Sequence, residues 1–249
     1  MSLVDLTVVD GVAQIGLNRP EDANAFDLNM TRELAAAVER AAGESGVRAV
    51  LLTGAGPRFC AGGDVASFAT APDQPAHIHQ LATELVAAFR ALADLDKPVV
   101  VAVRGAVAGA GLALMLSCDV IVSAPASKFV FAYPGIGFTP DCGLSYLLPR
   151  AIGQQRALGF ALGGRDVDGT QALDWGLVTE VAEDAEARAR EVAIEWASGP
   201  STALGETRRL FRAGWELNRI SAGAEEARTI SRMVEGQEAQ SLIARFVAR

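Results

Sequence analysis

Two short apolar runs, each leading into a glycine-rich turn, constrain the fold of this chain more than any other feature. The run Val47–Thr53 leads to RFCAGGD at Arg58–Asp64, and the run Val99–Val103 leads to GAVAGAG at Gly105–Gly111. Short, strongly apolar runs that end near glycine are typical of buried strands. Small residues at a strand-to-helix turn let a ligand approach the backbone closely. We therefore expect buried strands whose ends are open to close contact.

The segments around these runs predict a layered arrangement of strands and helices. Leu3–Val9 and Val12–Leu17 alternate apolar and polar residues on either side of Asp10-Gly11, which is a strong hairpin signal. Apolar residues at helical spacing predict amphipathic helices from about Asp27 to Glu44 and from about Pro75 to Asp94. Because strands alternate with helices through about residue 180, we expect an α/β core.

The chain from Asp184 onward has a helical pattern throughout. Helices are expected at roughly 184–198, 200–213, 217–234 and 237–248. Such a tail cannot bury its apolar faces alone, so we expect it to pack on the core or on a neighbouring subunit. The chain is accordingly divided into a core at residues 1–183 and a C-terminal helical region at residues 184–249.

Charge and cysteine content argue against several classes of function. The net charge of −8 over 249 residues argues against nucleic acid as a partner. Three widely spaced cysteines without a CxxC motif indicate reduced thiols. No signal peptide is recognised and the apolar runs are too short to span a bilayer, so we expect a cytoplasmic protein without a membrane partner. His77 and His79 would point to different helix faces, so no metal site is expected.

The two glycine-rich turns, taken together, suggest a site for a developing negative charge. A helix that starts at such a turn leaves backbone N–H groups unpaired. Two such turns that converge would supply two donors for one oxyanion. Close packing of tight turns is the alternative explanation for either turn alone. A dinucleotide fingerprint is excluded at the second turn, because Leu114 stands where its third glycine is required.

Further stretches of the chain stand out in a fixed order. They are NRPEDANAF (Asn18–Phe26), FCAGGD (Phe59–Asp64), KPVVVAVRGAVAGAGLAL (Lys97–Leu114), CDVIVSAPASKF (Cys118–Phe129), GFTPDCGLSYLLPRAIG (Gly137–Gly153) and ALDWGLV (Ala172–Val178). In order and spacing, over nearly the whole chain, they resemble the motifs of the enoyl-CoA hydratase/isomerase (crotonase) superfamily. The resemblance implies a spiral of repeated ββα units with a C-terminal helical region that forms trimers or dimers of trimers. It also implies an acyl-CoA thioester substrate and no separate cofactor, since coenzyme A is part of the substrate.

Carried over to this chain, the resemblance assigns the oxyanion donors to the backbone N–H groups of Gly63 and Ala110. The family usually has glycine at the second position, and the Gly-Ala-Gly variant is familiar in its isomerase-like branch. The residues that the resemblance assigns to substrate binding are Ala23, Ala25, Phe26, Ala61, Gly62, Asp64, Val65, Tyr133 and Phe246. Arg249 resembles a further C-terminal contact to coenzyme A.

Several of these residues have a second explanation. Arg19 or Arg58 would meet a phosphate of coenzyme A or lie solvated on the surface. Asp64 fits a helix cap better than a catalyst. Phe246 would contact coenzyme A across a subunit boundary or serve helix packing. Tyr133, with Phe131 and Phe138, suggests a bulky or flat acyl group, and core packing explains these aromatic residues equally well.

The chain departs from the hydratase pattern at both catalytic glutamates. The matching positions are Ala113 and Tyr133. Alanine carries no proton, and tyrosine, with a reference pKa near 10, is a poor base at neutral pH. One acid remains in this region, Asp141, and the resemblance to isomerases that use an aspartate here implies proton transfer. Capping of the following helix is the alternative role for Asp141.

Three functions remain open on these grounds. The first is an enoyl-CoA isomerase that shifts a C=C bond, with Asp141 as its single acid–base group. The second is a hydratase or hydrolase in which Asp141 activates water or attacks the thioester. The third is a non-catalytic acyl-CoA-binding protein, which the absence of both glutamates makes credible.

Overall fold

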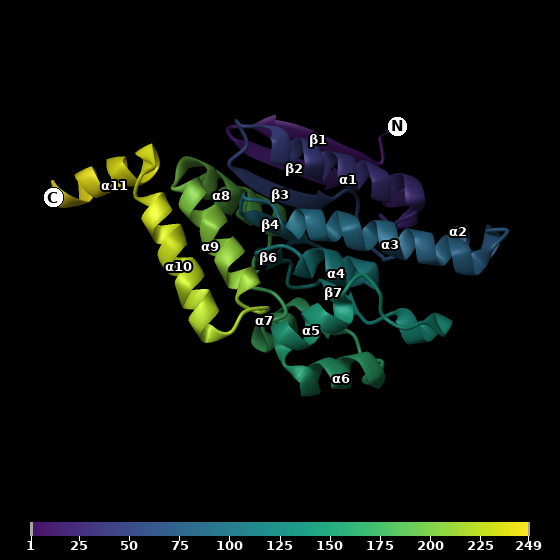
Figure 1. The fold of residues 1–249 in the computed structure, drawn as a ribbon. Helices are drawn as coiled ribbons and strands as arrows, with labels where there is room; N and C mark the ends of the chain where they lie inside the picture. The colour runs from purple at the N-terminus through teal and green to yellow at the C-terminus, as the bar shows by residue number, and fades with distance from the viewer. Residues whose placement is uncertain (1, 249) are drawn as a thin grey trace.

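A computed structural model describes residues 2–248 and contains two β-sheets with helices packed around them (Figure 1). The larger sheet has the strand order β1-β2-β3-β4-β6-β9, in which β1 and β2 pair antiparallel and the other neighbours pair parallel. Its strands are β1 (Val4–Val9), β2 (Val12–Leu17), β3 (Ala49–Gly54), β4 (Val99–Val103), β6 (Val120–Ser123) and β9 (Glu180–Val181). The smaller sheet has the order β5-β7-β8, with β5 (Ala106–Ala108), β7 (Lys128–Val130) and β8 (Val167–Asp168). The predicted α/β class is confirmed.

The predicted N-terminal hairpin is confirmed. Val9 pairs with Val12 across the turn. Both turn residues have left-handed backbone, with φ of 51° at Asp10 and 78° at Gly11. A two-residue turn with two positive φ values matches the twist of paired strands, which explains why Asp-Gly is favoured there.

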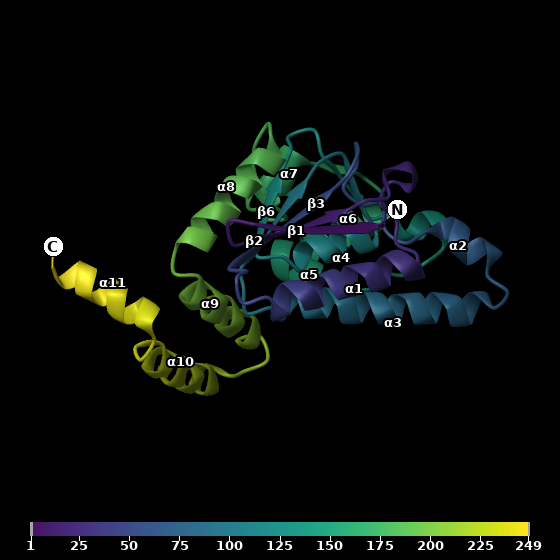
Figure 2. The same cartoon turned by 90° about the horizontal axis from the view of Figure 1, so that it is seen from above.

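Helices cover both faces of the larger sheet. Along β3, the side chains of Val50 and Leu52 belong to one apolar cluster and those of Ala49 and Leu51 to another, as the two-residue period of a strand requires. The first face is covered by α1 (Leu28–Gly43) and α3 (Gln74–Ala93) and the second by α8 (Ala185–Ser198), as Figures 1 and 2 show. Asp27 caps α1 by accepting a hydrogen bond from the Met30 N–H at 2.8 Å.

Short helices connect the strands and the longer helices along the chain. These are η1 (Pro20–Asp22), α2 (Val65–Thr70), α4 (Ala110–Leu116), η2 (Tyr133–Ile136), α5 (Leu144–Ile152), α6 (Gln154–Gly163) and α7 (Gly169–Trp175). The predicted alternation of strands and helices fails after β7, because α5 and α6 follow one another without an intervening strand. Helix α4 is apolar and buried on nearly all sides, so it forms the centre of the core.

The C-terminal helices predicted from the sequence are confirmed. They are α8, α9 (Ser201–Ala213), α10 (Arg219–Met233) and α11 (Gln237–Val247). Helix α8 packs on the sheet, whereas α10 and α11 extend away from the body of the molecule (Figures 1 and 2). Large apolar side chains remain exposed there, among them Ile220, Ile230 and Phe246. Packing of this region on a neighbouring subunit stays a prediction. No helix in residues 2–248 has the length and apolar character to cross a membrane.

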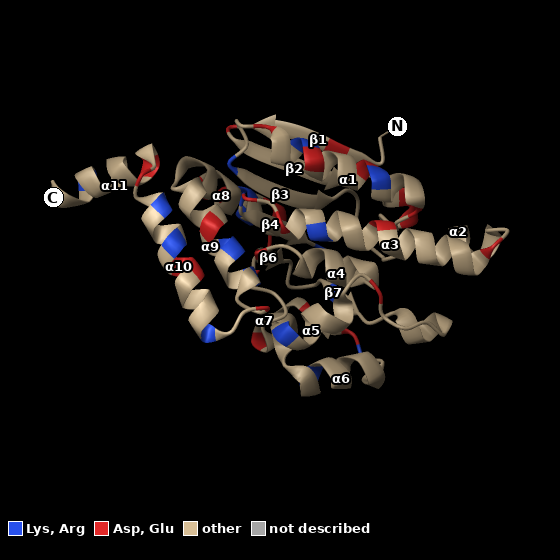
Figure 3. Ribbon diagram, viewed as in Figure 1, with Lys and Arg blue, Asp and Glu red and all other residues tan. Residues whose placement is uncertain are grey.

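Charged side chains of both signs are interspersed along the outer helices (Figure 3). Ion pairs between them join α10 to α9. Arg232 lies 2.8 Å from Glu206, and Arg209 lies 2.9 Å from Glu225. Exposed pairs of this kind contribute little individually, about 0–1 kcal/mol each. These pairs link α10 to α9 and do not attach α9 to the core.

A buried arginine attaches α9 to the core. The Arg208 side chain, only 6% exposed, lies 2.7 Å from the Asp119 carboxylate. Its guanidinium also donates to the Leu95 carbonyl, just beyond the end of α3. The same carboxylate accepts a hydrogen bond from the Val99 N–H at 2.8 Å, at the start of β4. Arg208 thus links α9 to the sheet and to the C-terminal end of α3.

We expect Arg208→Met to lower the free energy of unfolding by about 1–3 kcal/mol, because the buried Leu95 carbonyl loses the Arg208 donor, while Asp119 keeps its ion pair with Arg212 at 2.9 Å. Urea unfolding followed by circular dichroism measures this change. Arg228→Met is the matched control, since the Arg228 side chain is 67% exposed and pairs with Glu225 on its own helix. Equal losses in the two variants would contradict the anchoring role of Arg208.

Candidate active site

The first glycine-rich turn runs beside the loop Ala23–Phe26 and is bonded to it through the backbone. The Ala61 N–H donates to the Ala23 carbonyl at 3.0 Å, and the Phe26 N–H donates to the Gly62 carbonyl at 2.7 Å. The Asp64 N–H donates to the Phe26 carbonyl at 2.9 Å. These bonds hold the backbone on both sides of Gly63. Within residues 2–248, no group accepts a hydrogen bond from the Gly63 N–H itself.

Asn24 holds the loop in place. Its side chain is fully buried, and its Nδ2 donates to the carbonyls of Ala55, Arg58 and Phe59 at 2.9 to 3.0 Å. Its Oδ1 accepts from the Arg19 N–H at 2.9 Å. The backbone of Asn24 is left-handed, with φ of 54°, a conformation that asparagine tolerates better than most residues. The sequence did not lead us to predict this role for Asn24. The available signal was a polar residue between two alanines in a loop.

The second turn lies in direct contact with the first. A Cβ added at Gly62 would lie 3.2 Å from the Ala110 nitrogen and 3.0 Å from the Ala108 carbonyl oxygen, so only glycine fits there without displacement. Gly109 has φ of 53° and turns the chain into α4, whose first residue is Ala110. In the part of the chain that the structure describes, the Ala110 N–H also has no acceptor. The two unpaired N–H groups therefore belong to turns that touch.

Tyr133 links Asp141 to the second turn. The Tyr133 hydroxyl donates to Asp141 Oδ1 at 2.6 Å. A Cβ added at Gly109 would lie 4.0 Å from Cζ of the Tyr133 ring, so this ring packs against the turn. Burial, and then the negative charge of Asp141, raise the pKa of Tyr133, so the phenol stays protonated and acts as a donor.

The backbone around Asp141 explains why its side chain is available. Cys142 and Gly143 both have left-handed backbone, with φ of 52° and 75°. They turn the chain so that α5 starts at Leu144 without a side-chain cap. The capping role considered for the Asp141 side chain is therefore wrong. Within residues 2–248, no cation pairs with this carboxylate.

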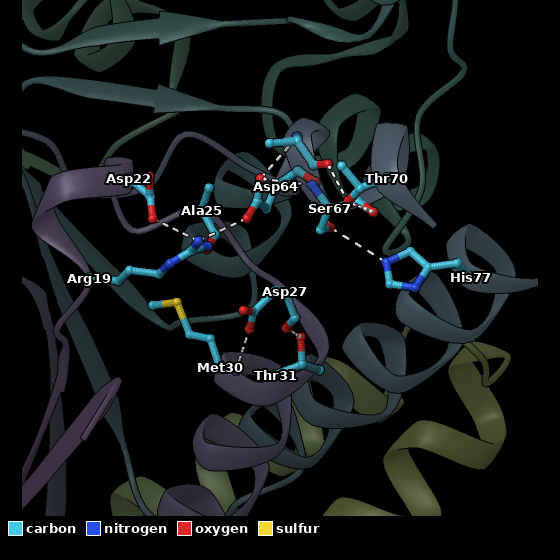
Figure 4. Close-up of polar contacts among 11 residues, drawn as sticks. Arg19, Asp22, Ala25, Asp27, Met30, Thr31, Asp64, Ser67, Thr70 and His77 are labelled. Carbon is cyan, nitrogen blue, oxygen red and sulfur yellow. Dashed lines mark hydrogen bonds and ion pairs between the residues drawn. The ribbon is translucent and has the colours of Figure 1, made fainter. Parts of the chain in front are cut away.

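Arg19 and Asp64 form an internal ion pair beside the first turn (Figure 4). Arg19 Nη2 lies 2.9 Å from Asp64 and 2.7 Å from Asp22, and Nη1 donates to the Ala25 carbonyl at 3.0 Å. The side chains of Arg19 and Asp64 are only 15% and 14% exposed. Arg19 is thus neither solvated nor free for a phosphate group, contrary to both expectations. The carboxylate of Asp64 caps α2 by accepting from the Ala66 N–H at 3.0 Å, as expected.

The remaining predicted residues fall into two groups. The loop residues Ala23, Ala25 and Phe26 are buried beside the first turn, and Val65 is exposed at the start of α2. Phe246 is 79% exposed on α11, which lies far from α4 in both Figure 1 and Figure 2. A contact of Phe246 with a ligand at the turns would therefore come from another subunit and stays a prediction. Arg249 lies outside the described residues.

The histidines and thiols near the site are poorly suited to chemistry. His77 Nε2 lies 3.4 Å from the Ser67 hydroxyl (Figure 4), and the described residues contain no cluster able to hold a metal ion. Burial raises the pKa of the Cys60 thiol to about 12. Burial, together with the negative charge of Asp141, raises the pKa of Cys142 as well. Both thiols are thus uncharged and weakly nucleophilic at neutral pH.

We expect the three cysteines of the native protein to resist alkylation by iodoacetamide at pH 8. The reactive thiolate of Cys60 forms only as the pH approaches its raised pKa of about 12, and all three side chains are buried. Mass spectrometry of native and urea-unfolded samples checks this, since unfolding should allow rapid labelling of every thiol. Fast labelling of Cys60 or Cys142 in the native protein would contradict it.

Comparisons with known proteins agree on one family. A sequence model described as enoyl-CoA hydratase/isomerase matches residues 7–249. The 1,2-epoxyphenylacetyl-CoA isomerase of Escherichia coli K12 is 36% identical over 91% of this chain and 87% of that protein. The 4-chlorobenzoyl coenzyme A dehalogenase-2 of an Arthrobacter species is 32% identical over 94% of this chain and 82% of that protein. The crystal structure of an enoyl-CoA hydratase from Polaromonas sp. JS666 superposes with a TM-score of 0.93 at 29% identity, over 98% of this chain and 96% of that one.

Proposed function

The chain belongs to the enoyl-CoA hydratase/isomerase family, and from this premise we propose that it shifts a C=C bond within an enoyl-CoA thioester. Asp141 is the single acid–base group in this proposal. The backbone N–H groups of Gly63 and Ala110 hold the enolate oxygen, and coenzyme A enters as part of the substrate. The names of the Escherichia coli and Arthrobacter relatives both specify a coenzyme A thioester, which supports this class of substrate.

The observation that carries the proposal is a combination of three groups in neighbouring segments. Among the described residues, one carboxylate has no cation partner and two backbone N–H groups have no acceptor. Asp141 has no cation partner among the described residues and is held by the Tyr133 hydroxyl. The other nearby carboxylate, Asp64, is already occupied by Arg19 and by the start of α2. The resemblance places Ala113 and Tyr133 where a hydratase has its glutamates, so only one proton-transfer group remains. One group that both takes and returns a proton suffices for an isomerase.

The reaction of a 3-enoyl thioester then proceeds in two proton transfers. Asp141 removes a proton from C2, and the electron pair of the broken C–H bond spreads over the thioester carbonyl and the C3=C4 bond as a dienolate. The N–H groups of Gly63 and Ala110 donate to the oxygen that carries the new charge. Protonated Asp141 then returns the proton to C4, and the double bond now joins C2 and C3. No water is consumed and Asp141 is regenerated as a carboxylate.

Tyr133 contributes by fixing the base. Its hydroxyl donates to Asp141 Oδ1, so in this proposal the second carboxylate oxygen takes the substrate proton. Because the raised pKa of Tyr133 keeps the phenol protonated, this donor persists through the neutral and moderately alkaline range. A fixed carboxylate needs little reorientation between C2 and C4, which lowers the entropic part of the barrier.

We further propose a homotrimer or a dimer of trimers as the working assembly. The exposed apolar residues of α10 and α11, such as Ile220 and Ile230, are suited to contact with another copy. Such a contact would also bring Phe246 to a site other than that of its own chain.

Asp141→Asn is expected to lower double-bond migration by about 10²–10⁴-fold, the usual contribution of a positioned acid–base group. Binding of a saturated acyl-CoA should change little, since asparagine keeps the size of the side chain. The measurement compares wild type and variant with 3-enoyl-CoA and 2-enoyl-CoA panels in deuterated water, followed by mass spectrometry. Hydrated product from wild type would reject the isomerase in favour of a water-activating enzyme, and binding without any exchange would favour a non-catalytic binder.

Ala110→Pro tests the oxyanion donor, because proline removes this N–H group. Proline is tolerated at the first position of a helix, where its missing N–H has no intrahelical partner. We expect kcat to fall by about 10²–10³-fold, as for loss of one oxyanion donor. The matched control is Ala185→Pro, the same substitution at the first residue of α8, far from the turns. Full activity of folded Ala110→Pro enzyme would exclude this N–H group as a donor.

A further inference from the structure

Two phenylalanine rings connect the segment that follows Gly63 to the segment that precedes Asp141. Phe68, on α2, and Phe138, just after η2, stack with ring centroids 6.2 Å apart and an interplanar angle of 22°. A Cβ added at Gly63 would lie only 2.7 Å from Cζ of Phe68, so this ring lies against the proposed oxyanion donor. The pair therefore borders the space in which the thioester would react.

The second ring is fixed to the acid–base side of the site. Phe138 stands three residues before Asp141. Its N–H donates to the Tyr133 carbonyl at 2.9 Å, and Tyr133 in turn donates from its hydroxyl to Asp141. Phe68 thus lies against the proposed donor Gly63, and Phe138 is linked through Tyr133 to the proposed base Asp141. An acyl group held between donor and base must pass along this pair of rings.

Phe68 is partly buried against the core, whereas the Phe138 ring is exposed. Phe138 is 39% exposed and is flanked by Ile136, which is 46% exposed, while Val65 at the start of α2 is 47% exposed. Phe131, by contrast, packs internally against Phe160 with centroids 6.1 Å apart. Core packing therefore explains Phe131, whereas Phe68 is the one aromatic partner of Phe138 within residues 2–248. An exposed apolar edge beside a polar reaction centre is typical of a ligand surface.

We propose that Phe68 and Phe138 determine specificity by selecting thioesters whose acyl group ends in an aryl ring. This inference rests on the proposed function, because it assumes that the acyl group reacts between Gly63 and Asp141. Aromatic rings gain from offset-stacked or edge-to-face contact beyond the apolar area that they bury. A saturated chain buries similar area against the same rings without that gain. The two rings thus favour an arylacyl group over an alkyl group of equal carbon number.

The test compares two pairs of thioesters matched in carbon number. Turnover is measured with 4-phenyl-3-butenoyl-CoA and 3-decenoyl-CoA, and binding is measured calorimetrically with 4-phenylbutanoyl-CoA and decanoyl-CoA, which carry no double bond to move. We expect wild type to prefer the aryl member of each pair. Phe68→Leu and Phe138→Leu should each lower the aryl-to-alkyl ratio on the order of three- to tenfold, since leucine keeps apolar area but has no ring.

Two control variants separate selectivity from general damage. Phe138→Tyr keeps the ring and should keep the aryl preference. Phe211→Leu removes a ring that is 77% exposed on α9 and should change neither ratio. An equal preference for aryl and alkyl thioesters in wild type, or ratios unchanged in both leucine variants, would overturn the proposal. Because the saturated pair measures binding alone, the aryl preference can be tested even in a protein that isomerises none of the substrates.

Discussion

The contact between the two glycine-rich turns is the constraint on which the site depends. Strands β3 and β4 are parallel neighbours, so the chain leaves both at the same edge of the sheet. A Cβ at Gly62 would collide with the second turn, because the Ala110 nitrogen and the Ala108 carbonyl lie within 3.2 Å of its position. The approach is possible only because glycine lacks that atom. A larger residue at position 62 would displace the second turn and would also have to adopt a φ of 102°, which favours glycine.

This arrangement leaves backbone donors without protein partners, which is uncommon in native structures. Ala110 is only 2% exposed, so its N–H meets little solvent. The loop beside the first turn is, by contrast, well bonded: Asn24 donates to a set of loop carbonyls, and Arg19 pairs with Asp64 and donates to the Ala25 carbonyl. A buried donor left open beside such a bonded loop is suited to a ligand group.

Local patterns in the sequence predicted the parts of the fold that depend on near neighbours. The hairpin follows from Asp10-Gly11, the caps follow from Asp27 and Asp64, and the C-terminal helices follow from apolar periodicity. Contacts between distant residues could not be predicted in this way. Arg19 pairs with a residue 45 positions away, and Asn24 binds carbonyls 31 to 35 positions away. The failed expectation for Arg19 concerns such a contact, because Asp64 occupies its guanidinium. The expected Asp141 cap failed for a local reason, since the left-handed backbone of Cys142 and Gly143 separates Asp141 from the start of α5.

The proposed site therefore has two parts, and a substitution in one part need not disturb the other. In the proposed reaction, proton transfer depends on Asp141, which a short hydrogen bond from the buried Tyr133 holds in place. The proposed contact with the acyl group depends on Phe68 and Phe138, whose rings stack on one another. Phe68 is also partly buried against the core, whereas Phe138 is exposed. Replacing the Phe138 ring therefore disturbs few other interactions, whereas replacing Tyr133 removes the hydrogen bond to Asp141 and the packing against Gly109. On the proposed assignment, this difference in coupling would let one frame keep its reaction while the acyl groups it accepts change.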